Sequence, residues 1–509
     1  MSNGRFYITT AIPYVNGDPH LGHALEFVQA DVLARHRRLR NESVRFLSGT
    51  DDNALKNVDA AVAAGLPVAG LVAEKAQRFL DLTGPLQLSN DDFIRTSTDP
   101  RHRPGVERLW RACAEAGDLY QRDYEGLYCA GCEAFVVPDD LANGLCPEHG
   151  ETPELIVESN WFFRLSRYQG ALLDLIESGR LRIEPEHRRN EVLAFIRRGL
   201  TDFSVSRDQE RARGWGIPVP DDPDQVIYVW FDALANYVTA LGYGSDSDAY
   251  RRWWHESSER LHVIGKGIIR FHAIYWPAIL LSAKQPLPTT IFVHDYLTIE
   301  GLKLSKSLGA ALDPLLVIER YGTDALRWWF VRDGLRNGDA DFREELIAAR
   351  ANELADGLGN LINRTIALVS RSRPDGVRHT WLVPAEASLL RTRCGELPSA
   401  IDKALVSFDL REAAAALWEV VVEGNRFVTV TRPWELAKAD RAGDPHATER
   451  LDTVLAVLLD ACRTITAELR PFLPAAAERI TAALTQLDAQ QGRTLFPKLQ
   501  AGRASRGAG

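Results

Sequence analysis

The chain has 509 residues, of which 45% are hydrophobic and 25% charged, as is typical of a globular protein. This length exceeds what a single hydrophobic core supports, so we expect about two to four domains. Sixty Lys and Arg residues against 69 Asp and Glu residues give a net charge of −9. That balance excludes a protein whose whole surface is basic and binds nucleic acid, although a local basic face remains compatible with it.

The cysteine content and the apolar stretches indicate the compartment. Six cysteines are too few for a disulfide framework in a chain of this length. The amino-terminal residues have no apolar core of a signal peptide, and the longest apolar stretches, such as 273–283, are too short to span a bilayer. We therefore expect a cytoplasmic protein with reduced thiols and no membrane partner.

The first elements in chain order predict an α/β sheet. A strand at 6–10 leads through a turn at 13–19 into a helix from His20 to about Arg38, and a second strand follows at 44–47. Strand, turn, helix and strand in this order form the first unit of a parallel sheet. Ligands of such sheets bind at the carboxyl ends of the strands.

The middle of the chain predicts an insertion into that sheet. Residues 113–224 are rich in Gly, Pro and charged residues. Three cysteines, Cys129, Cys132 and Cys146, lie within 18 residues of one another in this range. Strand character returns at 226–230, 261–264 and 290–293, where we expect the sheet to be completed.

From about residue 345 onward the pattern is helical. Apolar residues recur with a period near 3.6 through 349–370, 385–407, 410–431 and 448–470. The predicted domains are an α/β domain in two halves (1–112 and 225–344), the insertion (113–224), a helical domain (345–500) and a disordered tail (501–509).

The tetrapeptide His20-Leu21-Gly22-His23 lies where the first strand turns into a helix. Unpaired backbone amides and the positive end of the helix dipole favour phosphate there, and a glycine lets the ligand approach the backbone. Two imidazoles at positions i and i+3 can both face a phosphate chain. Two capping histidines without a ligand are the alternative interpretation of an isolated pair.

The segment Lys303-Leu304-Ser305-Lys306-Ser307 predicts a mobile cationic loop. Two lysines between small residues can neutralise charge that builds up on a transferred or leaving phosphate. On its own, such a segment is more often a solvated surface loop.

The spacing of three cysteines and one histidine predicts a metal site. Cys129-x2-Cys132 and, thirteen residues later, Cys146-x2-His149 form two short knuckles. Three thiolates and one imidazole are a tetrahedral ligand set for Zn²⁺, and a site without an open position is structural. We expect the metal to be coupled to folding of the insertion and not to the chemistry.

The histidine tetrapeptide and the lysine segment together resemble the two signatures of class I aminoacyl-tRNA synthetases, usually written HIGH and KMSKS. Further segments resemble the methionyl-tRNA synthetase family, and the resemblance extends from about Phe6 to Leu499. These segments are residues 10–17, 124–129, 215–220, 228–233, 265–266, 270–272, 275–278, 360–364 and 433–436.

The resemblance implies a Rossmann-type catalytic domain split by a zinc-binding insertion and followed by an α-helical anticodon-binding-type domain. It implies a methionine–tRNA ligase that uses ATP with Mg²⁺ to form methionyl-adenylate and transfers the methionyl group to the 3′ end of tRNA(Met). A monomer is favoured. The residues implied to bind ATP are His20, Gly22, His23, His294, Lys303, Ser305 and Lys306, of which His20, His23, Lys303 and Lys306 are implied to be catalytic.

The resemblance also implies an amino-acid pocket. Asp51 would pair with the ammonium group of methionine, and apolar and aromatic side chains suit its unbranched thioether. The other implied pocket residues are Ile12, Tyr14, Trp230, Ala233, Leu234, Tyr237, Ile268 and His272.

The chain departs from the family pattern, which leaves the acceptor open. In the family a tryptophan near the C-terminal helix stacks on an anticodon base, whereas this chain has no tryptophan after Trp434. Asn425, Arg426 and Trp434 remain as candidate anticodon residues. One alternative is a synthetase-like paralogue that passes the activated amino acid to a small amine or hydroxyl, and another is an inactive tRNA-binding module. Near the sites, the departures are Asp52, Asn53, Ala54, Gly267 and Asp295, the last of which we expect to place a carboxylate near the phosphates.

Overall fold

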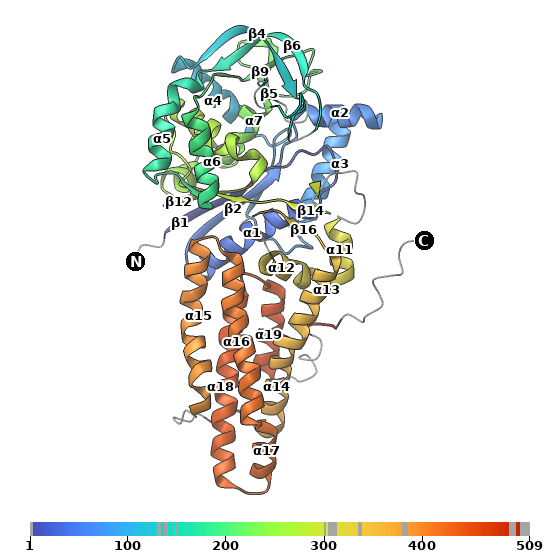
Figure 1. Ribbon diagram of the computed structural model, residues 1–509, viewed down its shortest axis with the longest axis vertical. Helices are drawn as coiled ribbons and strands as arrows, with labels where there is room; N and C mark the ends of the chain where they lie inside the picture. The colour runs from blue at the N-terminus through green and yellow to red at the C-terminus, as the bar shows by residue number, and fades with distance from the viewer. Residues whose placement is uncertain are drawn as a thin grey trace.

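The molecule consists of three parts stacked along its long axis (Figure 1). An antiparallel sheet lies at one end, a parallel sheet with its helices lies in the middle, and a bundle of long helices forms the other end. The computed structural model describes residues 4–129, 134–136, 138, 141–147, 150–299, 302–303, 313–333, 338–378, 385–487 and 495–498.

A six-stranded, wholly parallel sheet forms the centre of the molecule. The strands predicted at 6–10, 44–47, 261–264 and 290–293 are confirmed as members of it. Its edge strand β7 comes from within the range 113–224, so this range also contributes to the parallel sheet. In spatial order the strands are β3 (Asp92–Arg95), β2 (Ser43–Thr50), β1 (Arg5–Thr10), β12 (Glu259–Gly265), β13 (Thr290–His294) and β7 (Arg182–Glu184).

The prediction of a sheet strand at 226–230 is wrong. Strand β11 (Asp222–Ile227) belongs to a separate antiparallel sheet, and helix α7 (Val229–Leu234) begins two residues after it ends. The apolar run from 226 to 229 is buried, and a short buried run has the same hydrophobicity in a strand and in a helix.

Three smaller sheets accompany the parallel sheet. The described part of the range 113–224 forms an antiparallel sheet of β5 (Ala134–Val136), β4 (Leu119–Cys129), β6 (Glu154–Phe163) and β8 (Phe203–Ser204). The other two sheets are β10 (Pro218–Val219), β11 and β9 (Ser206–Asp208), and β15 (Leu302–Lys303), β14 (Leu297–Ile299) and β16 (Ala340–Asp341).

Helix α1 (Leu21–Leu39) connects the parallel sheet with the helical bundle. It lies between them (Figure 1), and its apolar residues belong to one continuous core that extends from β1 into the bundle. At its end the guanidinium of Arg40 donates to Glu468 at 2.7 Å. The buried ion pair of Asp31 with Arg327, at 2.7 Å, fixes the middle of the helix. Charges buried this deeply are tolerated because they are paired.

Seven helices form the bundle within the described residues. The helix predicted at 349–370 comprises α13, a π-helical turn (Leu354–Gly359) and α14, and the other three predicted helices are confirmed. The predictions omitted α17 and α19, which are short and begin at prolines. The bounds are α13 (Glu344–Glu353), α14 (Asn360–Ser372), α15 (Ser388–Val406), α16 (Leu410–Thr431), α17 (Pro433–Arg441), α18 (Pro445–Leu469) and α19 (Pro474–Gln486).

The remaining helices surround the sheets. Of the helices that the structure describes, none is by itself long and apolar enough to cross a bilayer, and α2 with α3 meets that test only as a pair bent by 106°. The bounds are α2 (Leu55–Ala64), α3 (Val68–Asp81), α4 (His102–Glu115), α5 (Gln169–Glu177), α6 (Glu186–Arg197), α8 (Asn236–Thr239), α9 (Asp248–Tyr250), α10 (Trp276–Ser282), α11 (Pro314–Tyr321) and α12 (Thr323–Arg332).

Candidate active site

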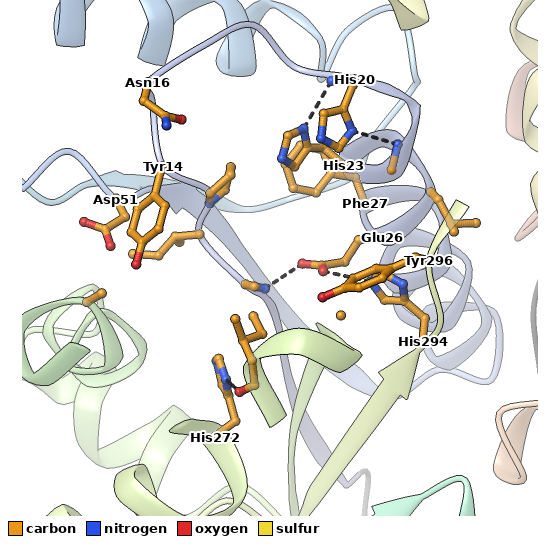
Figure 2. A pocket seen from close by; sticks show the side chains of 18 of the residues that line it. Tyr14, Asn16, His20, His23, Glu26, Phe27, Asp51, His272, His294 and Tyr296 are labelled. Atoms are coloured by element: carbon orange, nitrogen blue, oxygen red, sulfur yellow. Dashed lines mark hydrogen bonds and ion pairs between the residues drawn. The ribbon is translucent and has the colours of Figure 1, made fainter. Parts of the chain in front are cut away.

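Two histidines form the amino-terminal cap of α1. The backbone N–H of Gly22 donates to Nδ1 of His20, and the backbone N–H of His20 donates to Nδ1 of His23, both at 3.1 Å. The two rings stack with centroids 3.8 Å apart (Figure 2). Because each Nδ1 accepts a hydrogen bond, the neutral rings carry their proton on Nε2 and present it as a donor. The two histidines therefore cap the helix, and the orientation of their Nε2–H groups is compatible with phosphate binding.

Glu26 lies one turn further along α1 and joins the helix to two strands. Its Oε1 accepts from the backbone N–H of Ala11 at 2.8 Å, and its Oε2 lies 2.9 Å from Nε2 of His294 (Figure 2). The Nδ1 of His294 donates to the carbonyl oxygen of Asp295 at 2.8 Å. Burial lowers the pKa of His294, but the hydrogen bond and charge of Glu26 outweigh it and raise this pKa above its ordinary value. His294 is thus held as a cation by acceptors on both ring nitrogens.

A tyrosine and a histidine meet on the other side of the cavity. The Nδ1–H of His272 donates to the carbonyl oxygen of Ile268 at 2.9 Å, so its Nε2 accepts from the hydroxyl of Tyr237 at 2.7 Å. Burial lowers the pKa of His272 to about 4 and raises that of Tyr237. Both side chains are therefore neutral at pH 7, and this pair adds no charge to the cavity.

An indole and a carboxylate complete this side of the cavity. Trp230 in α7 stacks face to face on Phe271, with ring centroids 3.7 Å apart and planes at 2°. Asp51 follows β2, is buried, and forms a backbone bridge with Tyr14 (Figure 2). A buried carboxylate beside stacked aromatic rings can bind an ammonium group whose side chain is apolar.

One cavity of about 330 Å³ brings the predicted residues together. It contains four residues predicted to bind ATP, namely His20, Gly22, His23 and His294. All nine residues predicted to bind the amino acid also line it, namely Ile12, Tyr14, Asp51, Trp230, Ala233, Leu234, Tyr237, Ile268 and His272.

The lysine segment is described only at its start. The backbone of Lys303 lies in β15, opposite Thr298 of β14, while Ser305 and Lys306 lie outside the described residues. Strand β14 follows directly from the loop at His294–Tyr296, which lines the cavity.

The five departures from the family pattern have different surroundings. Asp295 lines the cavity, and its carboxylate is paired with Arg188, so its negative charge is balanced. The carboxylate of Asp52 is buried and accepts from the hydroxyls of Thr50 and Ser97, each at 2.7 Å. Like Asp52, the other three residues do not line the cavity. Asn53 donates to Asp232 at 2.8 Å, Ala54 is buried at the start of α2, and Gly267 lies in a 3-10 turn at Lys266–Ile268.

Two of the four predicted zinc ligands lie within the described residues. Cys129 ends β4, and both it and Cys146 are buried. The carbonyl oxygen of Cys146 accepts from the N–H of Gly150 at 2.8 Å. Cys132 and His149 lie outside the described residues. No group of three metal-ligating side chains occurs in the part of the chain that the structure describes.

The three candidate anticodon residues differ in exposure. The amide of Asn425 donates to the carbonyl oxygens of Gly357 and Val421, each at 3.0 Å, so it holds the bundle together. Arg426 pairs with Glu423 at 2.7 Å. Trp434 is 48% exposed at the start of α17, at the end of the bundle farthest from the parallel sheet (Figure 1). Arg426 is exposed as well, but of the three only Trp434 presents an aromatic ring to solvent.

Sequence reasoning missed Glu26 and Arg188. Glu26 is the only acidic residue between His20 and Val28 in the predicted first helix, and it lies on the buried face of that helix. A single acidic residue among apolar ones was a signal that the sequence alone provided. Arg188 is one of many arginines in 113–224, and nothing local distinguishes it.

Comparison with known proteins agrees with this geometry. The family described as "tRNA synthetases class I (M)" matches residues 6–152 and 131–366, and the "Anticodon binding domain of methionyl tRNA ligase" matches residues 381–506. A methionine–tRNA ligase of Brucella suis is 39% identical over 94% of this chain and 92% of its own length. One of Thermotoga maritima is 38% identical over 94% and 74%.

A solved structure shows the same fold. The Mycobacterium tuberculosis methionyl-tRNA synthetase in complex with methionyl-adenylate superposes with a TM-score of 0.90 at 37% identity, covering 97% of this chain and 96% of that one. The chain belongs to the methionine–tRNA ligase family of the class I tRNA synthetases.

Proposed function

We propose that the chain activates L-methionine with ATP and transfers the methionyl group to the 3′ end of tRNA(Met). The observation that supports this proposal most directly is that two features share one cavity. A helix end capped by histidines faces a neutral aromatic wall that contains a buried carboxylate. The first feature suits a phosphate chain, and the second suits an amino acid with an apolar side chain.

Methionine suits the apolar half of the cavity. Its thioether is unbranched and polarisable, and contacts of sulfur with aromatic rings such as Trp230 add to the binding free energy. Asp51 binds the ammonium group of the substrate, since a buried carboxylate is stabilised by an opposite charge. The neutral Tyr237 and His272 impose no charge on the side-chain pocket.

The first reaction is attack of a methionine carboxylate oxygen on the α-phosphorus of ATP. The new O–P bond forms methionyl-adenylate, and the bond to the β-phosphate breaks, releasing pyrophosphate. The Nε2–H groups of His20 and His23 donate to phosphate oxygens, and the cationic His294 lies close to them. Lys303 and Lys306 neutralise the leaving pyrophosphate, with Ser305 beside them. This step depends on positioning and charge neutralisation. Mg²⁺ accompanies ATP.

The second reaction is attack of a terminal ribose hydroxyl of tRNA on the adenylate carbonyl, with release of AMP. The helical domain supports tRNA as acceptor, because it matches an anticodon-binding domain. Trp434 is suited to stack on an unpaired anticodon base, so the chain does not need a later tryptophan. Transfer to a small amine or hydroxyl is not favoured, because the tRNA-binding part of the chain is retained.

A structural Zn²⁺ in the insertion belongs to this proposal. Cys129, Cys132, Cys146 and His149 supply a complete tetrahedral set, and the burial of the two described thiols fits a closed site. The metal would stabilise the fold of the two knuckles, since these short segments have little apolar core of their own.

Methionine-dependent exchange of labelled pyrophosphate into ATP tests the activation step. We expect exchange with methionine and at least about a hundredfold less with leucine or with norvaline, which lacks the thioether. Absence of exchange with any amino acid would overturn the proposal and favour an inactive tRNA-binding module.

A further inference from the structure

A buried ion pair lies directly beside the proposed ATP site. The side chain of Asp295 is only 2% exposed, and that of Arg188 is 17% exposed. The carboxylate of Asp295 contacts the guanidinium of Arg188 and also accepts from the backbone N–H of Gly338 at 2.8 Å. A carboxylate this deeply buried is costly unless it is paired, so both partners are needed to hold it.

The pair connects three segments that are distant in the sequence. Arg188 lies in the first turn of α6, Asp295 follows β13, and Gly338 precedes β16. Gly338 has a φ of +118°, a conformation that residues with a Cβ rarely adopt, and this places its N–H toward Asp295. Burial lowers the pKa of Arg188, but hydrogen bonds to Glu191 and Asp295 outweigh it and raise this pKa.

The contact with Gly338 begins a continuous series of hydrogen bonds. The next residue, Asp339, accepts from the N–H of Tyr296 at 3.0 Å. The N–H of Ala340 then donates to the carbonyl oxygen of Tyr296 at 3.1 Å, and the N–H of Phe342 to that of Thr298 at 2.7 Å. Asp295 therefore lies at the first position of the pairing between β14 and the segment that contains β16.

The same small sheet carries the start of the lysine segment. β14 pairs with β16 on one edge and with β15 on the other, where Thr298 lies opposite Lys303. On its other side, Asp295 accepts through its carbonyl oxygen from Nδ1 of His294. One residue thus adjoins both the cationic histidine and the strand that leads into the lysine segment.

We propose that Asp295, held by Arg188, is a positioning residue for the ATP-dependent step and fixes β14, β15 and His294 relative to the cavity. This inference rests on the proposed function, because it assigns ATP to that side of the cavity. Neither side chain needs to touch the substrate, since Arg188 acts through the carboxylate of Asp295, and Asp295 acts through the backbone of Gly338. The effect should be confined to ATP, because the aromatic wall is formed by other segments.

Three variants test this proposal in the pyrophosphate exchange assay. Asp295→Gly removes the carboxylate, Asp295→Asn keeps an acceptor for Gly338 but not the charge, and Arg188→Gln removes the cation. We expect Asp295→Gly to raise the KM for ATP about tenfold and to lower kcat, with the KM for methionine unchanged within about twofold. Asp295→Asn should be the milder variant of the two.

The double variant Asp295→Asn with Arg188→Gln should lose less than the sum of its single variants, because neither charge is then left without a partner. Arg197→Gln is the matched control, since Arg197 lies on the same helix in an exposed pair with Glu177. An unchanged KM for ATP in every variant of the pair would overturn the proposal. An equal rise in both KM values would also overturn it.

Hydrogen exchange of the intact protein, measured without substrates, tests the positioning role independently of the enzymatic activity. In Asp295→Gly, peptides covering 296–303 and 338–342 should exchange at least several-fold faster than in the wild type, and peptides of α5 should not change. Unchanged exchange at 296–303 would contradict the positioning role. If the wild type shows no methionine-dependent activity, the proposed function fails, and this measurement still decides whether the pair fixes the small sheet.

Discussion

The carboxylate of Glu26 on α1 holds the imidazole of His294 on β13 at 2.9 Å, across the cavity floor. The same carboxylate accepts from the backbone of Ala11, at the end of β1. One acidic side chain therefore sets the relative position of the first helix and of two strands, β1 and β13, which lie on either side of β12. Because its hydrogen bond and negative charge raise the pKa of His294, it also favours a positive charge near the proposed phosphate site.

Glu26→Gln should shift the pH dependence of activation to lower pH. The pKa of His294 is raised in the folded protein, so the imidazolium is present at low pH and is lost as pH rises through that value. Without the carboxylate this loss occurs at a lower pH, and exchange at pH 7.5 should fall about tenfold. The pH profile of kcat/KM for ATP measures the shift, with Glu256→Gln, an exposed partner of Arg5, as control. Coincident profiles would contradict the role of Glu26.

Tyr237→Phe should weaken methionine binding selectively. The variant leaves Nε2 of His272 without its donor inside the cavity wall, so we expect the KM for methionine to rise about tenfold or more. The KM for ATP should stay within about twofold, because the histidines of α1 do not contact this pair. Tyr250→Phe removes a hydroxyl bonded to Gln285 away from the cavity and is the matched control. Similar effects of the two substitutions would indicate a general loss of packing.

Burial of His272 predicts a loss of stability in acid. The folded pKa is about 4, below the ordinary value of about 6.5, so the unfolded chain binds the proton more readily. Stability should fall as pH drops from about 6.5 to 4, by up to about 3 kcal/mol from this residue. Urea unfolding at several pH values measures the slope, and His272→Asn should reduce it. An identical slope in the variant would show that His272 does not contribute.

Trp434→Ala should affect tRNA and leave activation unchanged. Stacking of a base on an exposed indole contributes about 1–3 kcal/mol, so the KM for tRNA(Met) should rise about tenfold or more. Pyrophosphate exchange should be unchanged, because Trp434 lies at the far end of the bundle. Val422→Ala, another exposed apolar side chain of the bundle, is the control. A normal charging rate in Trp434→Ala would remove this residue from anticodon reading.

Metal analysis of the purified protein should find about one zinc per chain. Cys146→Ser should release it and make the insertion sensitive to proteolysis, while the more distant Cys394→Ser in α15 should retain the metal. A wild type without zinc that keeps a protease-resistant insertion would contradict the structural site.

The sequence predicts features that depend on neighbouring residues. The glycine between His20 and His23 and the apolar period after them place a helix start at a phosphate site, and α1 begins at Leu21. The long helices α15, α16 and α18 follow from their period of 3.6. The run at 226–230 was misassigned because a buried apolar segment has no period that separates strand from helix.

Contacts between distant segments could not be predicted in this way. Arg188 meets Asp295 only because α6 packs on β7, which pairs with β13, and nothing in the sequence around Arg188 distinguishes it from the other arginines of 113–224. The sequence predicted that the carboxylate of Asp295 lies near the phosphates. It did not predict that Arg188 balances the charge of this carboxylate. Asn425 was a candidate for the anticodon because of the family resemblance, and the sequence did not show that its amide joins α16 to the π-helical turn.

The most direct test of the account is charging of unfractionated tRNA with labelled methionine, with exchange activity measured on the same sample. We predict both activities, with label in the tRNA(Met) fraction and a charging rate that falls in Trp434→Ala. Exchange without charging would contradict tRNA as the acceptor.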